Sequence, residues 1–411
     1  MKIAGIFSTL ALSTLVLFET LFLYTGKPAI VAVRNTGKVL SLGDENNITI
    51  EVSNTRKSRY FISLYDEIPY QFQLRDFEMV LSLKPKETQL LKYSLRPVTR
   101  GEYHFGYINV IFSANFQLIS RRIQCAEPQM VKVVPSIIQM KKYELIALAR
   151  ISTMSGIKKL RRIGHSYEFE QIKNYSQGDD IRSINWKATA RKDSLMVNQY
   201  QDERSQQVYM IIDKSRNMHM PFNGLSLLDY SINTSLVLSN IALLKHDKTG
   251  LITYSHRIGT TLPAEKSTNQ LKKILHALYA EKPQNLEGNY DLLYRSVKNV
   301  IKSRSLIMLF LNFESSYAME RALPILQKIN KQHLLVVMIF ENTELKTYTH
   351  QKAEFVSDIY AQTIALKLSM EKKQIVSKLR KYGIQTILSR PEDLSINVVN
   401  KYLELKAKGL I

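Results

Sequence analysis

The sequence has very little cysteine or tryptophan, and it lacks the common motifs of metal sites and nucleophilic centres. One of its 411 residues is cysteine, Cys125, and one is tryptophan, Trp186. A single cysteine excludes an intrachain disulfide framework and fits a reducing compartment. The chain has no zinc-ligand spacing, no Gly-x-Ser-x-Gly elbow, no His-Glu-x-x-His pair and no Gly-x-x-x-x-Gly-Lys-Ser/Thr loop. The common sequence signatures of hydrolases, zinc enzymes and nucleotide-binding proteins are therefore missing.

Acidic residues are also few compared with basic ones. The chain has 57 Lys and Arg against 36 Asp and Glu, which gives a formal net charge of +21. Such an excess favours an acidic partner, which can be nucleic acid, an anionic membrane surface or an acidic protein. No nucleic-acid-binding signature accompanies the charge, so charge alone supports that class. A hydrophobic content of 45% with 23% charged residues indicates a globular protein, and the length suffices for two or three domains.

The amino-terminal residues 1–26 are predicted to form a membrane anchor helix. Ile3 to Tyr24 is almost continuously apolar, and a helix needs about 20 residues to span a bilayer. A cleaved signal peptide is the main alternative, but no small-x-small cleavage site follows the apolar run. Glu19 lies toward one end, where a charge costs less than at the centre of the bilayer. Three basic residues follow the segment and predict a single-pass anchor in the inner (cytoplasmic) membrane with the bulk in the cytoplasm: Lys27, Arg34 and Lys38.

Residues 29–134 are predicted to form an antiparallel β-sandwich. Short stretches of alternating apolar and polar residues recur there, with turn residues between them. The expected strands are Ile48–Val52, Tyr60–Leu64, Met79–Leu83, Gln89–Tyr93 and Tyr103–Phe112. Many short strands at this spacing are typical of a two-sheet sandwich, which serves more often as a spacer or interaction module than as a catalyst.

Residues 135–205 are predicted to form a structured connector. A helix is expected over about Lys141–Met154, and the stretch Gly164 to Tyr200 then carries densely alternating charges around Trp186. We interpret it as a clamp in which Arg and Lys pair with carboxylates, so that Arg182→Ala or Trp186→Ala should reduce folding stability. A solvated charged surface is one alternative, and a docking surface for a partner is another.

Residues 206–411 alternate between buried strands and helices, which predicts a doubly wound α/β domain with a mostly parallel sheet. Ligands of such domains bind beyond the carboxyl ends of the strands, where the winding direction reverses. The strands Gln207–Ile212 and Ser305–Leu311 should flank this point. Asp213 and Asn312, which follow these strands, are then expected to face each other.

Asp213, Ser215 and Asn217 place oxygen-bearing side chains at alternate positions of one loop. With Asn312 they form a candidate site for Mg²⁺, which prefers oxygen ligands. The alternative is that Asp213 and Ser215 cap the following turn by ordinary hydrogen bonds, as such residues commonly do. The sequence favours the two interpretations equally.

The chain resembles the domain of unknown function 58 (DUF58) family, whose core contains a von Willebrand factor A-like fold. The resemblance rests on Glu168-Phe-Glu170, on Gly178-Asp-Asp-Ile-Arg-Ser-Ile-Asn-Trp-Lys-Ala-Thr-Ala-Arg191 and on Asp213–Met218, and it also covers Arg96–Tyr103 and Asn400–Leu405. The positions of the central motif are Glu168, Glu170, Gly178, Asp179, Arg182, Trp186, Lys187 and Arg191.

The resemblance implies a bacterial, membrane-anchored protein that is encoded beside a MoxR-type AAA+ ATPase and has no catalysis of its own. It also implies an adhesion-type metal site with the pattern Asp-x-Ser-x-Ser followed by a Thr and an Asp. This chain matches at Asp213 and Ser215 and departs at Asn217 and Asn312. Such proteins often begin with two membrane spans, whereas one is found here.

The predicted function is that of a non-catalytic protein-binding scaffold, which works with the ATPase in the assembly or chaperone-like maturation of a client. A metal-dependent hydrolase at Asp213 is one alternative, and a basic nucleic-acid-binding protein is another.

Overall fold

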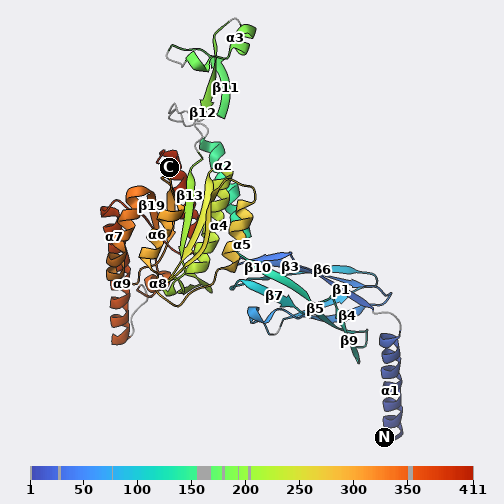
Figure 1. Ribbon diagram of the computed structural model, residues 1–411. Coiled ribbons are helices and arrows are strands. Elements are labelled where there is room, and N and C mark those ends of the chain that lie inside the picture. Colours follow the sequence, from blue (N-terminus) through green and yellow to red (C-terminus); the bar gives the residue numbers. More distant parts are fainter. Residues whose placement is uncertain are drawn as a thin grey trace. The chain divides into compact units, whose positions relative to one another are not determined.

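The computed structural model describes residues 2–25, 29–75, 77–154, 168–177, 181–192, 194–201, 205–349 and 355–410. The chain divides into two compact units (Figure 1). The first unit comprises Met1–Gln139, Pro221–Asp229 and Leu278–Ala280, and the second comprises Met140–Met220, Tyr230–Ala277 and Glu281–Ile411. The two short segments from the carboxyl-terminal half that group with the first unit were not expected from the order of the sequence.

The first unit consists of an apolar helix and a set of short strands. The helix is α1 (Lys2–Tyr24), which matches the predicted helical segment. The strands are β1 (Ile30–Asn35), β2 (Val39–Ser41), β3 (Asn46–Asn54), β4 (Tyr60–Asp66), β5 (Glu78–Leu83), β6 (Thr88–Leu95), β7 (Gly101–Phe105), β8 (Ile108–Ser113), β9 (Ser120–Cys125) and β10 (Gln129–Val134). A 3-10 turn η1 (Tyr70–Phe72) and the short strands β14 (Pro221–Phe222) and β15 (Leu225–Ser226) complete it.

These strands form separate small sheets in the orders β1-β3-β6, β5-β4-β8-β9 and β2-β10-β7. The first two sheets are antiparallel and share one buried apolar cluster, to which β3 contributes Ile50 and Val52 and β4 contributes Ile62 and Leu64. Alternate residues of β3 and β4 are buried, as expected when one face of a strand is packed. The antiparallel sheet region predicted for residues 29–134 is confirmed.

The single strand predicted over Tyr103–Phe112 is wrong. The chain turns at Gly106 and Tyr107, so that β7 and β8 lie in different sheets. The backbone amides of both turn residues donate to Glu67, at 2.9 Å each, and a side chain at Gly106 would collide with the Glu67 carboxylate. A glycine that permits this close approach interrupts an otherwise strand-like pattern.

The second unit contains a hairpin and a six-stranded sheet with helices. The helix α2 (Ile137–Met154) leads to the hairpin strands β11 (Glu168–Asn174) and β12 (Met196–Gln201), which enclose a 3-10 turn η2 (Ile181–Ser183) and the helix α3 (Trp186–Lys192). The larger sheet contains β13 (Gln207–Asp213), β16 (Lys248–Tyr254), β17 (Ile258–Glu265), β18 (Leu306–Phe310), β19 (Leu334–Phe340) and β20 (Gln385–Ser389). Its helical segments are η3 (Arg216–Met218), α4 (Leu227–Leu244), α5 (Gln270–Ala280), α6 (Tyr290–Val300), α7 (Ser316–Gln332), α8 (Thr343–Thr349), α9 (Val356–Lys381) and α10 (Leu394–Ala407).

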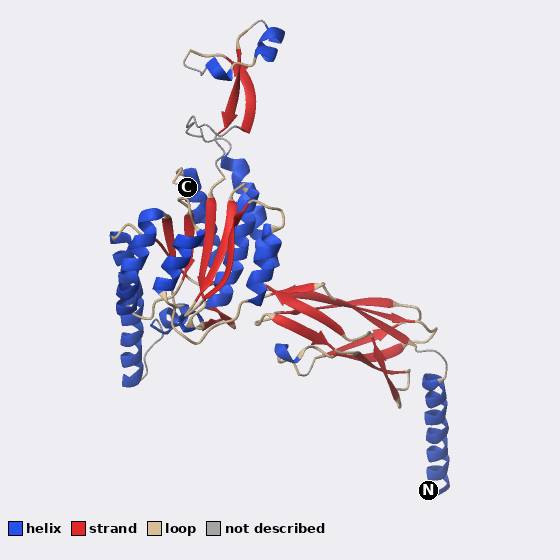
Figure 2. Ribbon diagram, viewed as in Figure 1, coloured by secondary structure: helices blue, strands red, loops and turns tan. Residues whose placement is uncertain are grey.

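The strand order of the larger sheet is β17-β16-β13-β18-β19-β20. All neighbouring strands are parallel except β17, which pairs antiparallel at one edge. The winding direction therefore reverses between β13 and β18, as the sequence predicted. The strands lie between helices, the arrangement expected of a doubly wound sheet (Figure 2).

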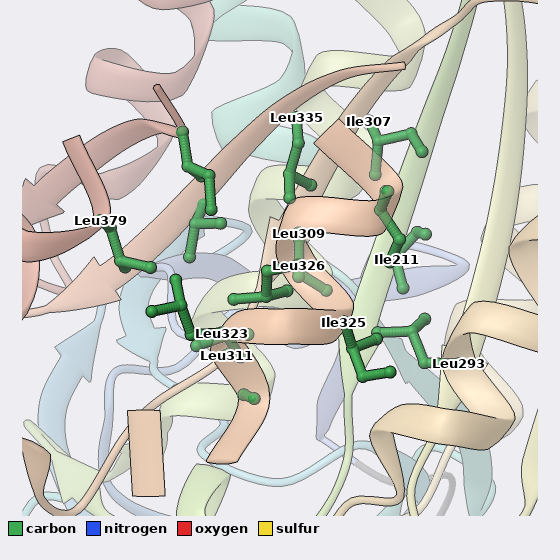
Figure 3. Packing of buried hydrophobic residues seen from close by; sticks show 14 of the residues in the cluster. Ile211, Leu293, Ile307, Leu309, Leu311, Leu323, Ile325, Leu326, Leu335 and Leu379 are labelled. Atoms are coloured by element: carbon green, nitrogen blue, oxygen red, sulfur yellow. The ribbon is translucent and has the colours of Figure 1, made fainter. Parts of the chain in front are cut away.

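The larger sheet is buried on both faces. Tyr209 and Ile211 of β13 point to the face that packs against α6, α7 and α9, whose Leu293, Leu326 and Leu379 belong to the same buried cluster (Figure 3). Met210 points to the opposite face, where the Ser239 hydroxyl of α4 lies 3.9 Å from its sulfur. Nearly continuous burial of β13, β16, β18 and β19 explains why their sequences are apolar runs without alternation.

Among the described residues, one helix is long and apolar enough to cross a membrane, and it is Leu227–Leu244. Because 83% of that window is buried inside the protein, this helix forms part of the α/β core. The apolar run Thr9–Tyr24 within α1 is shorter. Unlike α4, it exposes its large apolar side chains, with Leu10 62% exposed and Phe18 66% exposed.

Candidate functional site

The carboxyl edge of the larger sheet brings the candidate metal ligands Asp213 and Ser215 into one buried loop. Asp213, at the end of β13, is 1% exposed and Ser215 is 0% exposed. The Ser215 amide donates to Asp213 Oδ1 at 2.8 Å, and the Ser215 hydroxyl donates to Oδ2 at 2.9 Å. Both carboxylate oxygens are therefore engaged in the local turn that the capping interpretation predicted. Burial raises the pKa of Asp213 to about 6, and the hydrogen bonds from Ser215 oppose this shift.

Two tyrosines and a glycine surround the Asp213 carboxylate. Burial, together with the Asp213 charge, raises the pKa values of Tyr254 and Tyr290. The Tyr254 hydroxyl is buried and has no hydrogen-bond partner among the described residues. A Cβ atom at Gly288 would lie 3.3 Å from Asp213 Oδ1, a tight contact, so the chain after Glu287 passes close to the carboxylate. The carboxylate is thus enclosed by apolar and aromatic groups, which explains its raised pKa.

Asn312, just after β18, bonds to other groups. Its amide Nδ2 donates to the Asn217 carbonyl at 3.1 Å. Its Oδ1 accepts from the Lys372 ammonium of α9 at 2.7 Å, and the same ammonium also donates to the Phe313 carbonyl. Burial lowers the pKa of Lys372 to about 8, against the opposing effect of Glu371 and Glu314. A lysine ammonium therefore already holds the amide oxygen that a metal would need.

These residues do not fit a divalent metal. Asp213 is the one carboxylate of the predicted ligand set, and both of its oxygens accept from Ser215. The Asn217 Oδ1 atom is buried without a hydrogen-bond partner in the described part of the chain, but it is a neutral oxygen. Nowhere among the described residues do three His, Cys, Asp or Glu side chains gather as a metal would require. The geometry favours the capping interpretation over the Mg²⁺ site.

The family motif forms the β11–β12 hairpin and the segment that it encloses. The strands pair antiparallel from Glu168↔Gln201 to Asn174↔Met196, so Glu168 and Glu170 lie on β11. Gly178 and Asp179 lie outside the described residues. Arg182 lies in η2, while α3 carries Trp186, Lys187 and Arg191. We call residues 181–192 the hairpin tip.

The hairpin tip does not bury its tryptophan. Trp186 is 69% exposed and Ile181 is 70% exposed, whereas Met196 and Val197 of β12 are 4% and 1% exposed. Lys187 and Arg191 are exposed as well. An exposed ring adds little to a core, so the interpretation of Trp186 as a structural anchor has no support in these contacts. The exposure favours the docking alternative.

Two features of the second unit were not found from the sequence. The sequence does not single out Lys372 among its many basic residues, because nothing local signals its bond to Asn312, 60 positions earlier. The amino-terminal half of α9 exposes large apolar side chains, among them Ile359 at 56%, Tyr360 at 70% and Ile364 at 59%. Their helical spacing could have been found from the sequence, but it looks the same as that of a buried helix face.

Comparison with known proteins supports the family resemblance over part of the chain. Residues 171–370 match the family described as "Protein of unknown function DUF58". This range is narrower than the nearly complete resemblance inferred from the motifs, and Glu168 and Glu170 lie just before it. The chain is also 26% identical over 129 residues to a Bacillus subtilis (strain 168) protein described as "Uncharacterized protein YeaD", a match that covers 31% of this chain and 32% of that relative.

Two solved structures show weaker likeness. The conserved hypothetical protein BatB from Bacteroides thetaiotaomicron is 13% identical, with a TM-score of 0.30 over 49% of this chain and 99% of that one. The ASH / PapD-like domain of human CEP192 is 11% identical, with a TM-score of 0.21 over 28% of this chain and 92% of that one. At these TM-scores neither likeness carries an argument about fold or function.

Proposed function

From the match of residues 171–370 to the DUF58 family, we propose that this protein is a membrane-anchored, non-catalytic scaffold. It works with a MoxR-type AAA+ ATPase in the assembly or chaperone-like maturation of a client protein. The six-stranded unit has the order of a doubly wound sheet, and we propose that it is the von Willebrand factor A-like domain of such a scaffold. The apolar α1 is the anchor, with the β-rich part of the first unit and the second unit in the cytoplasm.

The observation that carries the proposal is the exposure of Trp186 at the hairpin tip. Large aromatic residues are normally among the more buried residues of a folded protein, and Trp and Arg dominate the binding energy of protein interfaces. Here Trp186 is 69% exposed beside Ile181 at 70%. A two-stranded hairpin is only marginally stable by itself, so a partner that covers these side chains also stabilises the hairpin.

The charge of the hairpin tip indicates the chemistry of its partner. The tip carries four basic residues, and three acidic residues flank it in the sequence: Arg182, Lys187, Arg191 and Lys192, with Asp179, Asp180 and Asp193 on either side. Basic side chains around an aromatic residue suit an acidic protein surface with an apolar recess for the indole. We assign the tip as the contact for the ATPase.

The hydrolase alternative gains no specific support at the carboxyl edge. Asp213 is held by Ser215, and Lys372 bonds to Asn312. The predicted site residues thus offer one carboxylate, already hydrogen-bonded, to a metal or to an attacking water.

Co-purification after cross-linking in detergent-solubilised membranes tests the proposal. Wild-type protein should bring down an AAA+ ATPase, and Trp186→Ala should lower the yield, because the loss of a hot spot of about 2 kcal/mol weakens the affinity roughly 30-fold. Tyr317→Ala is a matched control, because Tyr317 is an aromatic residue of the same unit that is 71% exposed. It should leave the yield unchanged.

Two results would count against the proposal. If no AAA+ ATPase is cross-linked to the wild-type protein, the partner is wrong. If Trp186→Ala and Tyr317→Ala retain the ATPase equally well, the contact lies elsewhere on the scaffold.

A further inference from the structure

The last turn of α1 is packed into the β-rich part of the first unit. Leu23 is 0% exposed and Glu19 is 2% exposed. Leu23 belongs to the apolar cluster that the sheets share, and the Phe22 ring stacks on Tyr60 with a centroid distance of 6.4 Å. The carboxyl-terminal end of α1 is therefore part of this folded unit.

Polar contacts fix the same turn of the helix. Arg56 donates to the Phe22 carbonyl at 2.8 Å, and Arg121 donates to the Leu23 carbonyl at 2.7 Å. These are carbonyls that the end of a helix leaves without intrahelical partners. Glu19 Oε2 accepts from the backbone amide of Leu118 at 3.0 Å. Leu118 lies in the turn between β8 and β9, so that turn is held directly beside α1.

This packing leaves too little of α1 to cross a bilayer by itself. Residues 2–18 precede Glu19, and at about 1.5 Å per residue they extend about 26 Å. The hydrocarbon core of a bilayer is about 30 Å thick. If α1 spans the bilayer, the helical turn that follows Phe18 must also lie within the hydrocarbon core. Leu21 in this turn is 58% exposed, so the turn has an apolar side chain that can contact lipid.

The β8–β9 turn, residues 114–119, presents apolar side chains at this level. Phe116 is 61% exposed and Leu118 is 43% exposed, although Leu118 is tied to Glu19 through its backbone. The apolar cluster formed by the described residues of the first unit does not include either side chain. Exposed large apolar side chains on a turn that is bonded to an apolar helix suit contact with a membrane.

The neighbouring loops at this end of the strands are basic. The loop after β3, the turn after β5 and the β8–β9 turn emerge together, as the pairings Ser53↔Thr88, Tyr60↔Leu83 and Phe61↔Ser113 require. Across these three connections the charged residues are five basic and one acidic: Arg56, Lys57, Arg59, Lys84, Lys86 and Glu87. This charge complements anionic lipid headgroups.

We propose that the β8–β9 turn is a second membrane-contacting element, which inserts Phe116 and Leu118 into the interface of the anionic bilayer that α1 crosses. The inference rests on the proposed anchoring by α1. The turn extends the apolar surface where α1 is too short, and the basic loops beside it bind the headgroups. The first unit is thereby held against the membrane surface.

Single tryptophans in the full-length protein test this arrangement. In a Trp186→Phe background, Phe116→Trp reports on the turn and Leu10→Trp reports on α1. Tyr70→Trp is the control, because Tyr70 is 80% exposed beyond the opposite end of β4, which is about 20 Å long at about 3.3 Å per residue. The proteins are reconstituted into phosphatidylcholine–phosphatidylglycerol vesicles whose acyl chains carry bromine at shallow or deep positions.

We expect deep bromines to quench Leu10→Trp, shallow bromines to quench Phe116→Trp with a blue-shifted emission, and neither to quench Tyr70→Trp. If Leu10→Trp is quenched while Phe116→Trp behaves like Tyr70→Trp, the inference is overturned and the anchor stands. If Leu10→Trp is not quenched, the anchor fails and the inference fails with it. The basic loops should bind anionic headgroups, so Phe116→Trp should be quenched less in vesicles of pure phosphatidylcholine. Equal quenching in the two kinds of vesicle would show that the basic loops do not contribute.

Discussion

Replacing Asp213 by Asn should stabilise the second unit at neutral pH. The folded-state pKa of about 6 lies above the ordinary value of 3.8, because burial disfavours the carboxylate. A difference of about 2 pKa units at about 1.4 kcal/mol each corresponds to about 3 kcal/mol as an upper bound. Asn removes the buried charge, and its side chain can still accept from the Ser215 amide and donate to the Ser215 hydroxyl, both of which now contact Asp213.

The effect must depend on pH in a defined direction. A group whose folded pKa is raised binds more protons in the folded state, so its contribution to stability is present below the unfolded pKa and is lost as pH rises through the folded value. The window here runs from about pH 4 to about pH 6. The neutral amide of the Asp213→Asn variant imitates the protonated carboxyl group, so variant and wild type should be equally stable near pH 4 and diverge as the pH rises.

Hydrogen exchange of the β13 amides measures the unfolding free energy of this unit without interference from the other one. The difference between Asp213→Asn and wild type should approach zero near pH 4 and reach about 1–3 kcal/mol near pH 7.5. Asp291→Asn is the matched control, because Asp291 is an exposed carboxylate at the start of α6, and it should show no such pH dependence.

A variant that is less stable than wild type at neutral pH would refute the reasoning from burial. So would a difference that stays constant with pH. Stabilisation of wild type by added Mg²⁺ that Asp213→Asn abolishes would restore the metal interpretation.

Three further substitutions test other contacts. Arg34→Met should lower the unfolding free energy of the first unit by about 3–5 kcal/mol, because it leaves the buried Asp66 carboxylate without its cation. Denaturant unfolding measures this loss, and a loss below about 1 kcal/mol would contradict the prediction. Tyr402→Phe should cost about 1–3 kcal/mol by removing the hydroxyl that donates to the buried Asp247, and hydrogen exchange in α10 should increase. Trp186→Ala should change thermal stability by less than about 0.5 kcal/mol, and a large drop in melting temperature would reinstate the structural clamp.

Much of the larger sheet could be predicted from the sequence, because parallel strands that are buried on both faces must be apolar runs. Gln207–Ile212 and Ser305–Leu311 were found as strands for this reason, and the reversal of winding between them followed from the usual order of such sheets. The strand predicted over Tyr103–Phe112 failed because alternation continues across Gly106, while the turn depends on Glu67 from a distant strand.

The sequence by itself determined the helical α1, the antiparallel and mixed sheets, and the motif that matches a family, because local periodicity and residue spacing encode these features. The tertiary structure decided which contacts are made by the residues that the sequence singled out. Both oxygens of Asp213 are held by Ser215, and Lys372 reaches Asn312 across the fold. Trp186 is exposed, and Glu19 is buried beside Leu118. Burial and long-range hydrogen bonds depend on which segments meet in space, and no local pattern records that.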